Sequence, residues 1–156
     1  MSYPTSPALL GVDFTEQTAD ARFKLGTKVQ DEAGTVWQYV KASASGNTKY
    51  LLYPILASFV LSANGTAYAA ANCGKLAAPQ ATLTASYYGW VAIQGPMTVS
   101  TAAAVTAFNK TYTSATAGEI DDASSSQNEI VGLYVLTDPG TAGDASCVAA
   151  VELFYH

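Results

Sequence analysis

Few side chains in this chain have the types and spacing that catalysis requires. The one histidine, His156, stands at the end of the chain, no serine lies in a G-x-S-x-G turn, and no glycine-rich phosphate loop opens a helix. Catalysis needs a nucleophile or base beside an orienting partner. We therefore expect that the protein is not an enzyme and uses no cofactor.

The residues that could bind a metal are one acidic group and two cysteines. Glu119, Asp121 and Asp122 carry carboxylates, but they lack the alternating ligands and the glycine of a calcium-binding loop, so a solvated loop is favoured. Cys73 and Cys147 are far apart and form no C-x-x-C motif. We favour reduced thiols over a disulfide because the N-terminus lacks the pattern of a signal peptide. The sequence thus predicts no metal site.

Aromatic rings offer a third kind of chemistry, the stacking of sugars. The chain has ten Tyr, five Phe and two Trp, and several of them gather in two runs, around Trp37 and around Trp90. Rings exposed on a rigid sheet would bind a glycan, whereas rings that share one face of a strand also form a core or a subunit interface. We favour a core or an interface over a glycan platform.

The elements that position these rings are predicted to be β-strands. Two alternating apolar runs within Phe23–Ala42 flank the turn Asp31-Glu-Ala-Gly34, which predicts a β-hairpin. Residues 81–95 alternate again and end at Gly95-Pro96, which predicts the end of a strand. Further strands are predicted at 50–61, followed by a turn at Asn64-Gly65, at 129–136 and at 147–155.

Two segments between these strands have other patterns. Thr101–Phe108 predicts one helical turn, and residues 111–126 predict a loop rich in Ser, Thr, Ala and Gly. The whole chain is therefore expected to be mainly β, a β-sandwich or β-barrel of about eight short strands with long loops. Residues 1–20, with Pro4 and Pro7, are expected to form an extended N-terminal arm, and residues 21–156 a single β-rich domain.

Charge and hydropathy exclude two classes of partner. Only 12% of the residues are charged and the net charge is −5, so the basic surface that phosphate neutralisation requires is missing. The longest apolar run, residues 50–61, is too short for a membrane helix and contains Pro54. We expect no nucleic-acid partner and no membrane partner.

Two motifs suggest a family. The pattern F-x-L-G-T-x-V-x-x-x-x-G-x-x-W-x-Y-V-x-A over residues 23–42, and Y-G-W-V-x-I-x-G-P over residues 88–96, resemble the small head decoration (cement) proteins of tailed bacteriophages. The resemblance extends more weakly through residues 115–122 and 130–136 and covers about half of the chain in pieces. These motifs are structural and carry no chemistry.

The resemblance implies a mechanical function. It implies a protein made in the host cytoplasm that binds the outer surface of the capsid in the virion, with the major capsid protein and copies of itself, as a homotrimer, as partners. The alternative is a tail-fibre module or a receptor- or glycan-binding module, which would share the composition. We expect the arm from Tyr3 to Phe14 to add a strand to the shell or to a neighbouring subunit. The predicted contact residues are Tyr3, Leu9, Leu10, Phe14, Trp37, Tyr39, Tyr87, Tyr88 and Trp90.

Overall fold

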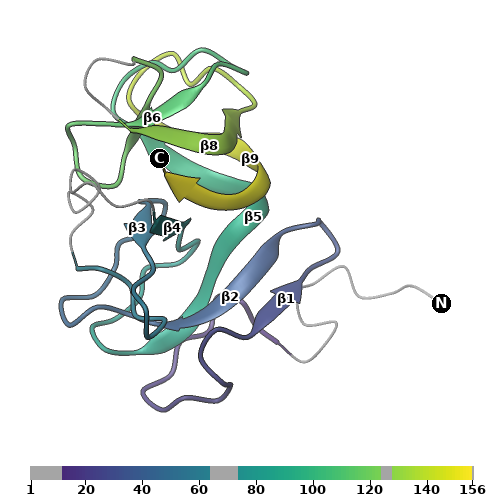
Figure 1. Ribbon diagram of the computed structural model, residues 1–156, viewed down its shortest axis with the longest axis vertical. Helices are drawn as coiled ribbons and strands as arrows, with labels where there is room; N and C mark the ends of the chain where they lie inside the picture. Colours follow the sequence, from purple (N-terminus) through teal and green to yellow (C-terminus); the bar gives the residue numbers. More distant parts are fainter. Residues whose placement is uncertain (1–11, 64–73, 124–127, 156) are drawn as a thin grey trace.

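The structure is a computed structural model that describes residues 12–63, 74–123 and 128–155. Within these residues the chain is all β and contains nine strands and no helix, which confirms the predicted fold class (Figure 1). The strands are β1 (Lys28–Gln30), β2 (Val36–Lys41), β3 (Tyr53–Pro54), β4 (Gly74–Ala77), β5 (Tyr88–Thr101), β6 (Thr111–Thr113), β7 (Ile120–Asp121), β8 (Glu129–Val135) and β9 (Gly143–Tyr155).

Five of these strands close into a barrel. The strands follow one another in the order β5, β7, β6, β8, β9, and β9 pairs back to β5, which completes the ring. The short contact of β5 with β7, at Thr101 and Ile120, is parallel, and the other contacts around the ring are antiparallel. Closure removes the open edges that a sandwich would leave. The interior is filled by fully buried side chains such as Val99, Ile120, Leu133 and Val135.

Strand β5 belongs to two sheets. Its first half pairs with β2, which in turn pairs with β1, and its second half, from Gly95 onward, pairs with β9 of the barrel (Figure 1). The prediction that the strand ends at Gly95-Pro96 is therefore wrong, because the strand changes its partner at this point and continues. Gly95 has a φ of 83°, and a Cβ there would lie 2.4 Å from the carbonyl oxygen of Gly34. Only glycine fits this crossing without strain.

The predicted hairpin of residues 23–42 is confirmed. Strands β1 and β2 pair in the antiparallel sense, with Val29 opposite Trp37. The turn between them is held by Asp31, whose carboxylate accepts hydrogen bonds from the Thr35 backbone N–H at 2.9 Å and from the Trp37 indole N–H at 2.8 Å. One side chain thus sets both the turn and the orientation of a core ring.

The helical turn predicted at Thr101–Phe108 is wrong. This segment uses its backbone N–H groups on neighbouring strands, from Ala102 to the Ile120 oxygen and from Phe108 to the Val135 oxygen, instead of within a helix. It crosses the end of the barrel with Val105 buried in the core. Tertiary bonds therefore override the weak local helix pattern.

The remaining strand predictions are partly right. Strands β8 and β9 lie where strands were expected at 129–136 and 147–155, although β9 begins earlier because its first residues pair with the end of β5. Residues 111–126, expected to be a loop, contain β6 and β7. The run at 50–61 forms the two-residue β3 and two isolated bridges, one between Ile55 and Leu61 and one between Val60 and Lys41 of β2. The predicted turn at Asn64-Gly65 lies outside the described residues.

Candidate functional site

Five of the predicted contact residues come together in one place. The Phe14 ring stacks on Trp37 with the ring centroids 4.8 Å apart and an interplanar angle of 9°, and it meets Trp90 edge-on at 5.5 Å. Tyr39 packs against Trp90 and Tyr88. With Phe23, which contacts both Tyr39 and Trp90, these rings form what we call the anchor cluster: Phe14, Phe23, Trp37, Tyr39, Tyr88 and Trp90.

Burial decides what most of these rings do. The exposed fraction is 4% for Phe14, 8% for Trp37, 2% for Tyr39 and 3% for Trp90. These four rings are packed inside the chain, in agreement with the core interpretation, and they leave little surface for the predicted contact with a shell. Stacked and edge-to-face rings add about 0.5–1.5 kcal/mol per pair beyond their burial.

The other predicted contact residues have different surroundings. Tyr88 is half-buried at the edge of the anchor cluster, with the Lys41 ammonium 5.4 Å from its ring centroid. Tyr87 is also half-buried, and its backbone oxygen accepts a hydrogen bond from the N–H of Ala42. Tyr3, Leu9 and Leu10 lie outside the described residues.

The segment that brings Phe14 to the cluster is tied to β5. The backbone groups of Thr18 and Tyr88 exchange two hydrogen bonds, of 3.0 and 2.8 Å. The Gln17 side-chain oxygen accepts a bond from the Thr84 N–H at 2.6 Å. Residues 12–18, which were expected to belong to the arm, are therefore packed on the domain.

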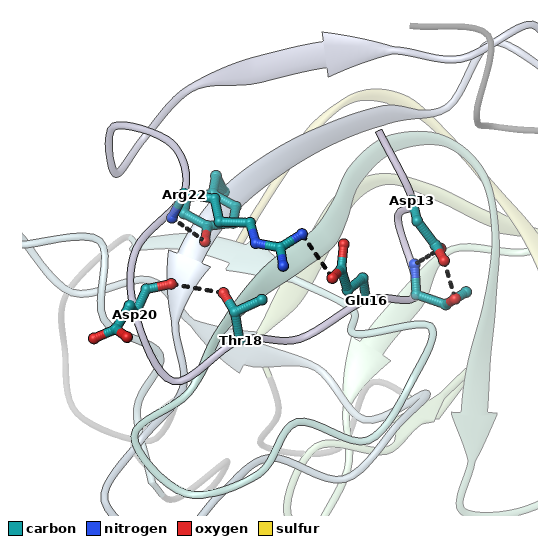
Figure 2. A network of polar contacts seen from close by, with 7 residues as sticks. Asp13, Glu16, Thr18, Asp20 and Arg22 are labelled. Carbon is teal, nitrogen blue, oxygen red and sulfur yellow. Dashed lines mark hydrogen bonds and ion pairs between the residues drawn. The ribbon is translucent and has the colours of Figure 1, made fainter. Parts of the chain in front are cut away.

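A polar network lies over the rings (Figure 2). The Arg22 guanidinium pairs with the Glu16 carboxylate at 2.7 Å, and the Arg22 backbone N–H donates to the Tyr39 hydroxyl at 3.1 Å. Asp13 accepts bonds from the N–H and the hydroxyl of Thr15, and these bonds hold the pKa of Asp13 below its ordinary value. Because the Arg22–Glu16 pair is exposed, it orients the segment more than it stabilises it.

The cavity between this network and the rings is too small for a ligand. It measures about 40 Å³ and is lined by residues that include Val12, Glu16 and Tyr88. A water molecule occupies about 30 Å³ in the liquid, whereas ligand pockets span about 300–1,000 Å³. The anchor cluster therefore has no room for a sugar, and its rings are not arranged as a glycan platform.

A second apolar region, not anticipated from the sequence, lies on the outside of the barrel. We call it the β8–β9 outer face. Tyr134 stands opposite Val148, and Val131 stands opposite Phe154, with their side chains pointing away from the core. The members of the face are Val131, Tyr134, Leu136, Val148, Val151 and Phe154. The alternation in residues 129–136 contained the signal, because apolar residues occupy the outward as well as the inward positions.

A groove opens at one end of this face, between β9 and the start of β4. The strand register shifts at Gly132, where one residue of β8 faces residues 150–153 of β9, and β9 bends strongly here (Figure 1). The groove has a volume of about 410 Å³ and apolar walls that include Val151, Leu153 and Phe154. We call it the β4–β9 groove.

The charges at the rim of the groove are paired with one another. The Glu152 carboxylate lies between the ammonium groups of Lys28 and Lys75, the second at 3.4 Å. The hydrogen bond from Lys28 and the two positive charges hold the pKa of Glu152 below its ordinary value. The rim therefore presents a neutralised cluster and not an isolated charge.

At the other end of the β8–β9 outer face stands Phe108. Its side chain is 69% exposed, its φ is 62°, and its N–H donates to the Val135 oxygen at 2.9 Å. The preceding loop is held by Asp122, which accepts a bond from the Thr106 N–H at 3.0 Å, and this bond lowers the pKa of Asp122. Asp122 thus has a structural partner.

No metal-binding group is found among the described residues: no three His, Cys, Asp or Glu side chains there are placed to hold an ion, and the acidic group around Asp122 is not such a site. Cys147 is a free, buried thiol, and burial raises its pKa to about 12, so it stays protonated at ordinary pH. Cys73 lies outside the described residues.

In the described part of the chain, no helix is long and apolar enough to cross a membrane. Comparison with known proteins gives no relative: no protein-family model, no curated protein and no solved structure matches this chain.

Proposed function

We propose that this protein is a decoration (cement) protein of a tailed-bacteriophage head, which binds the outer surface of the capsid and stabilises the shell by bridging its subunits. The motifs of residues 23–42 and 88–96 support this proposal through their resemblance to that family. Both motifs contribute strands to the anchor cluster, where Tyr39 packs against Trp90 and Phe14 links Trp37 to Trp90.

The observation that carries the proposal is the attachment of residues 12–18, the base of the proposed arm, to the folded domain. Phe14 is packed between Trp37 and Trp90, and Thr18 is bonded to β5. A segment that binds a shell must be firmly attached to the folded domain. The buried ring of Phe14 and the backbone hydrogen bonds between Thr18 and Tyr88 provide this attachment. In the proposal, Phe14 is the anchor and residues 1–11 supply the contact, by strand addition to the shell.

Size and charge are consistent with this function. A standard interface buries about 1,600 Å² in total, and many symmetric copies multiply a modest gain per copy. A net charge of −5 with only 12% charged residues gives an outer coat little attraction for released DNA. The homotrimer remains part of the proposal through the family resemblance alone.

The first test is the copy number of this polypeptide relative to the major capsid protein in purified virions, measured by quantitative mass spectrometry. A ratio of about one or about one-third, as symmetric shell positions require, supports a decoration protein. A handful of copies would favour the tail-fibre alternative. Absence from virions would overturn the proposal.

The second test separates the arm from its anchor. A protein that lacks residues 2–11 keeps Phe14 and should remain folded, but it should no longer bind assembled shells. The double variant Leu9→Ser and Leu10→Ser should weaken binding, whereas the matched control Thr5→Ala and Ser6→Ala should not. Unchanged saturation of shells by the truncated protein would show that the arm does not make the contact.

A further inference from the structure

The exposure of Phe108 is hard to explain within one chain. A bulky residue at a φ of 62° is strained by about 1–2 kcal/mol, and burial does not offset this strain because the ring is 69% exposed. The backbone bond from Phe108 to Val135 and the bond from the Thr106 N–H to Asp122 fix the backbone on which the exposed ring stands. Strain that the surrounding structure maintains is often connected with function.

The same chain carries a hollow that suits such a ring. The β4–β9 groove is an open surface depression with apolar walls, and its volume of about 410 Å³ is large enough to receive an aromatic ring. Val151, on its wall, is 43% exposed. An aromatic side chain would cover the exposed parts of Val151 and Phe154 and exclude water from both.

The ring and the groove lie at opposite ends of strand β8. Phe108 is bonded at Val135, whereas the groove begins where Val131 faces Phe154. Four residues of strand separate these points by about 13 Å. Two different complementary patches on one chain make a head-to-tail contact, which closes into a ring when the rotation between copies allows it.

We propose that Phe108 of one copy inserts into the β4–β9 groove of the next copy, so that the protein assembles head to tail into a closed ring. The charges favour a second copy as the occupant. A chain with a net charge of −5 repels its own copies, but both patches are flanked by paired charges, Lys110 with Glu129 near Phe108, and Glu152 with Lys28 and Lys75 at the groove.

This inference names the contact for the oligomer in the proposed function, and it rests on that proposal only for the expected number of three copies. It is tested on the isolated full chain by size-exclusion chromatography with light scattering over a range of concentrations. The wild type should be oligomeric. Phe108→Asp and Val151→Asp should each weaken self-association by about 30-fold or more, as loss of a hot spot does. The control Ala85→Asp adds the same charge at an exposed site near Gly46 and should change nothing.

Mixing the two variants tests the pairing itself. Phe108→Asp retains the groove and Val151→Asp retains the ring, so a mixture should form a one-to-one dimer although each variant alone is monomeric. Thermal unfolding of each variant shows that it is folded. A monomeric wild type, variants that assemble like the wild type, or a mixture that does not pair would each overturn the inference. Shell binding is measured separately, so a ring that binds no shell would refute only the proposed function.

Discussion

The anchor cluster and the β8–β9 outer face are both built from large apolar side chains on paired strands, but they end up in opposite surroundings. In the first, Phe14, Trp37, Tyr39 and Trp90 are buried, and residues 12–18 lay Phe14 across Trp37, whereas Phe23 and Tyr88 lie at its edge. In the second, Tyr134, Val151 and Phe154 remain exposed. The difference shows that residue type does not decide between core and binding surface here, and that a covering segment does.

The comparison is tested most strongly by removing the covering ring. Phe14→Ala should lower the free energy of unfolding by about 3–5 kcal/mol, because it leaves a cavity between two tryptophans. Leu56→Ala, which shortens an apolar side chain that is 51% exposed and lies outside both regions, should change it by no more than about 0.5 kcal/mol. Urea denaturation of both variants measures this contrast, and equal effects would mean that Phe14 is not an anchor.

The next largest loss of stability is expected at Gly95, where β5 changes its partner from β2 to β9. Gly95→Ala should destabilise the protein by about 2–4 kcal/mol, because the new Cβ combines a strained backbone with a clash against Gly34. Gly34→Ala is the matched control, since Gly34 has a φ of 91° but nothing within 4 Å of the added atom. Thermal unfolding should place Gly34→Ala clearly closer to the wild type.

A single polar contact inside the anchor region should matter less. Asp31→Asn leaves one carbonyl oxygen where two carboxylate oxygens serve Thr35 and Trp37, so it should cost about 1–2 kcal/mol. Asp138→Asn is the control, because Asp138 accepts one backbone bond, from Gly140, that asparagine can keep. If chemical denaturation shows the two variants to be alike, the indole bond contributes nothing.

The smallest effect is expected at the rim of the groove and depends on pH. Glu152 has a pKa lowered below 4.5 in the folded protein, so its ion pairs stabilise the fold above that value and are lost as the pH falls through the folded pKa. Glu152→Gln should therefore cost less than about 1 kcal/mol at pH 7, and the difference from the wild type should disappear as the pH falls through the folded pKa of Glu152. Glu32→Gln, in the exposed β1–β2 turn, serves as the control, and a difference that persists in acid would exclude the ion pairs as its cause.

The alternation of apolar residues was enough to predict the hairpin and strands β8 and β9, because side-chain periodicity reports directly on which face is buried. It was not enough for β6 and β7, which have three and two residues and are paired only because the barrel closes around them. The Gly95-Pro96 pair was misinterpreted for a related reason: a local breaker cannot show that a strand changes partner.

The candidate sites, too, could be predicted from local sequence patterns only in part. The aromatic residues of the two motifs do lie in one cluster, since Tyr39 packs against Trp90 and Phe14 links Trp37 to Trp90. The choice between a core and an interface could not be made from the sequence, because it depends on a segment that begins more than 20 residues before Trp37 in the chain. The β4–β9 groove could not be predicted at all, since it arises from the register shift at Gly132 and not from any motif.

The sharing of β5 between two sheets has a consequence for how the protein comes apart. The strand is 14 residues long and gives one half to β2 and the other to β9. Neither sheet can lose β5 without disrupting the other, so no smaller cooperative unit can melt alone. The described residues should therefore unfold in one calorimetric transition, with equal van't Hoff and calorimetric enthalpies.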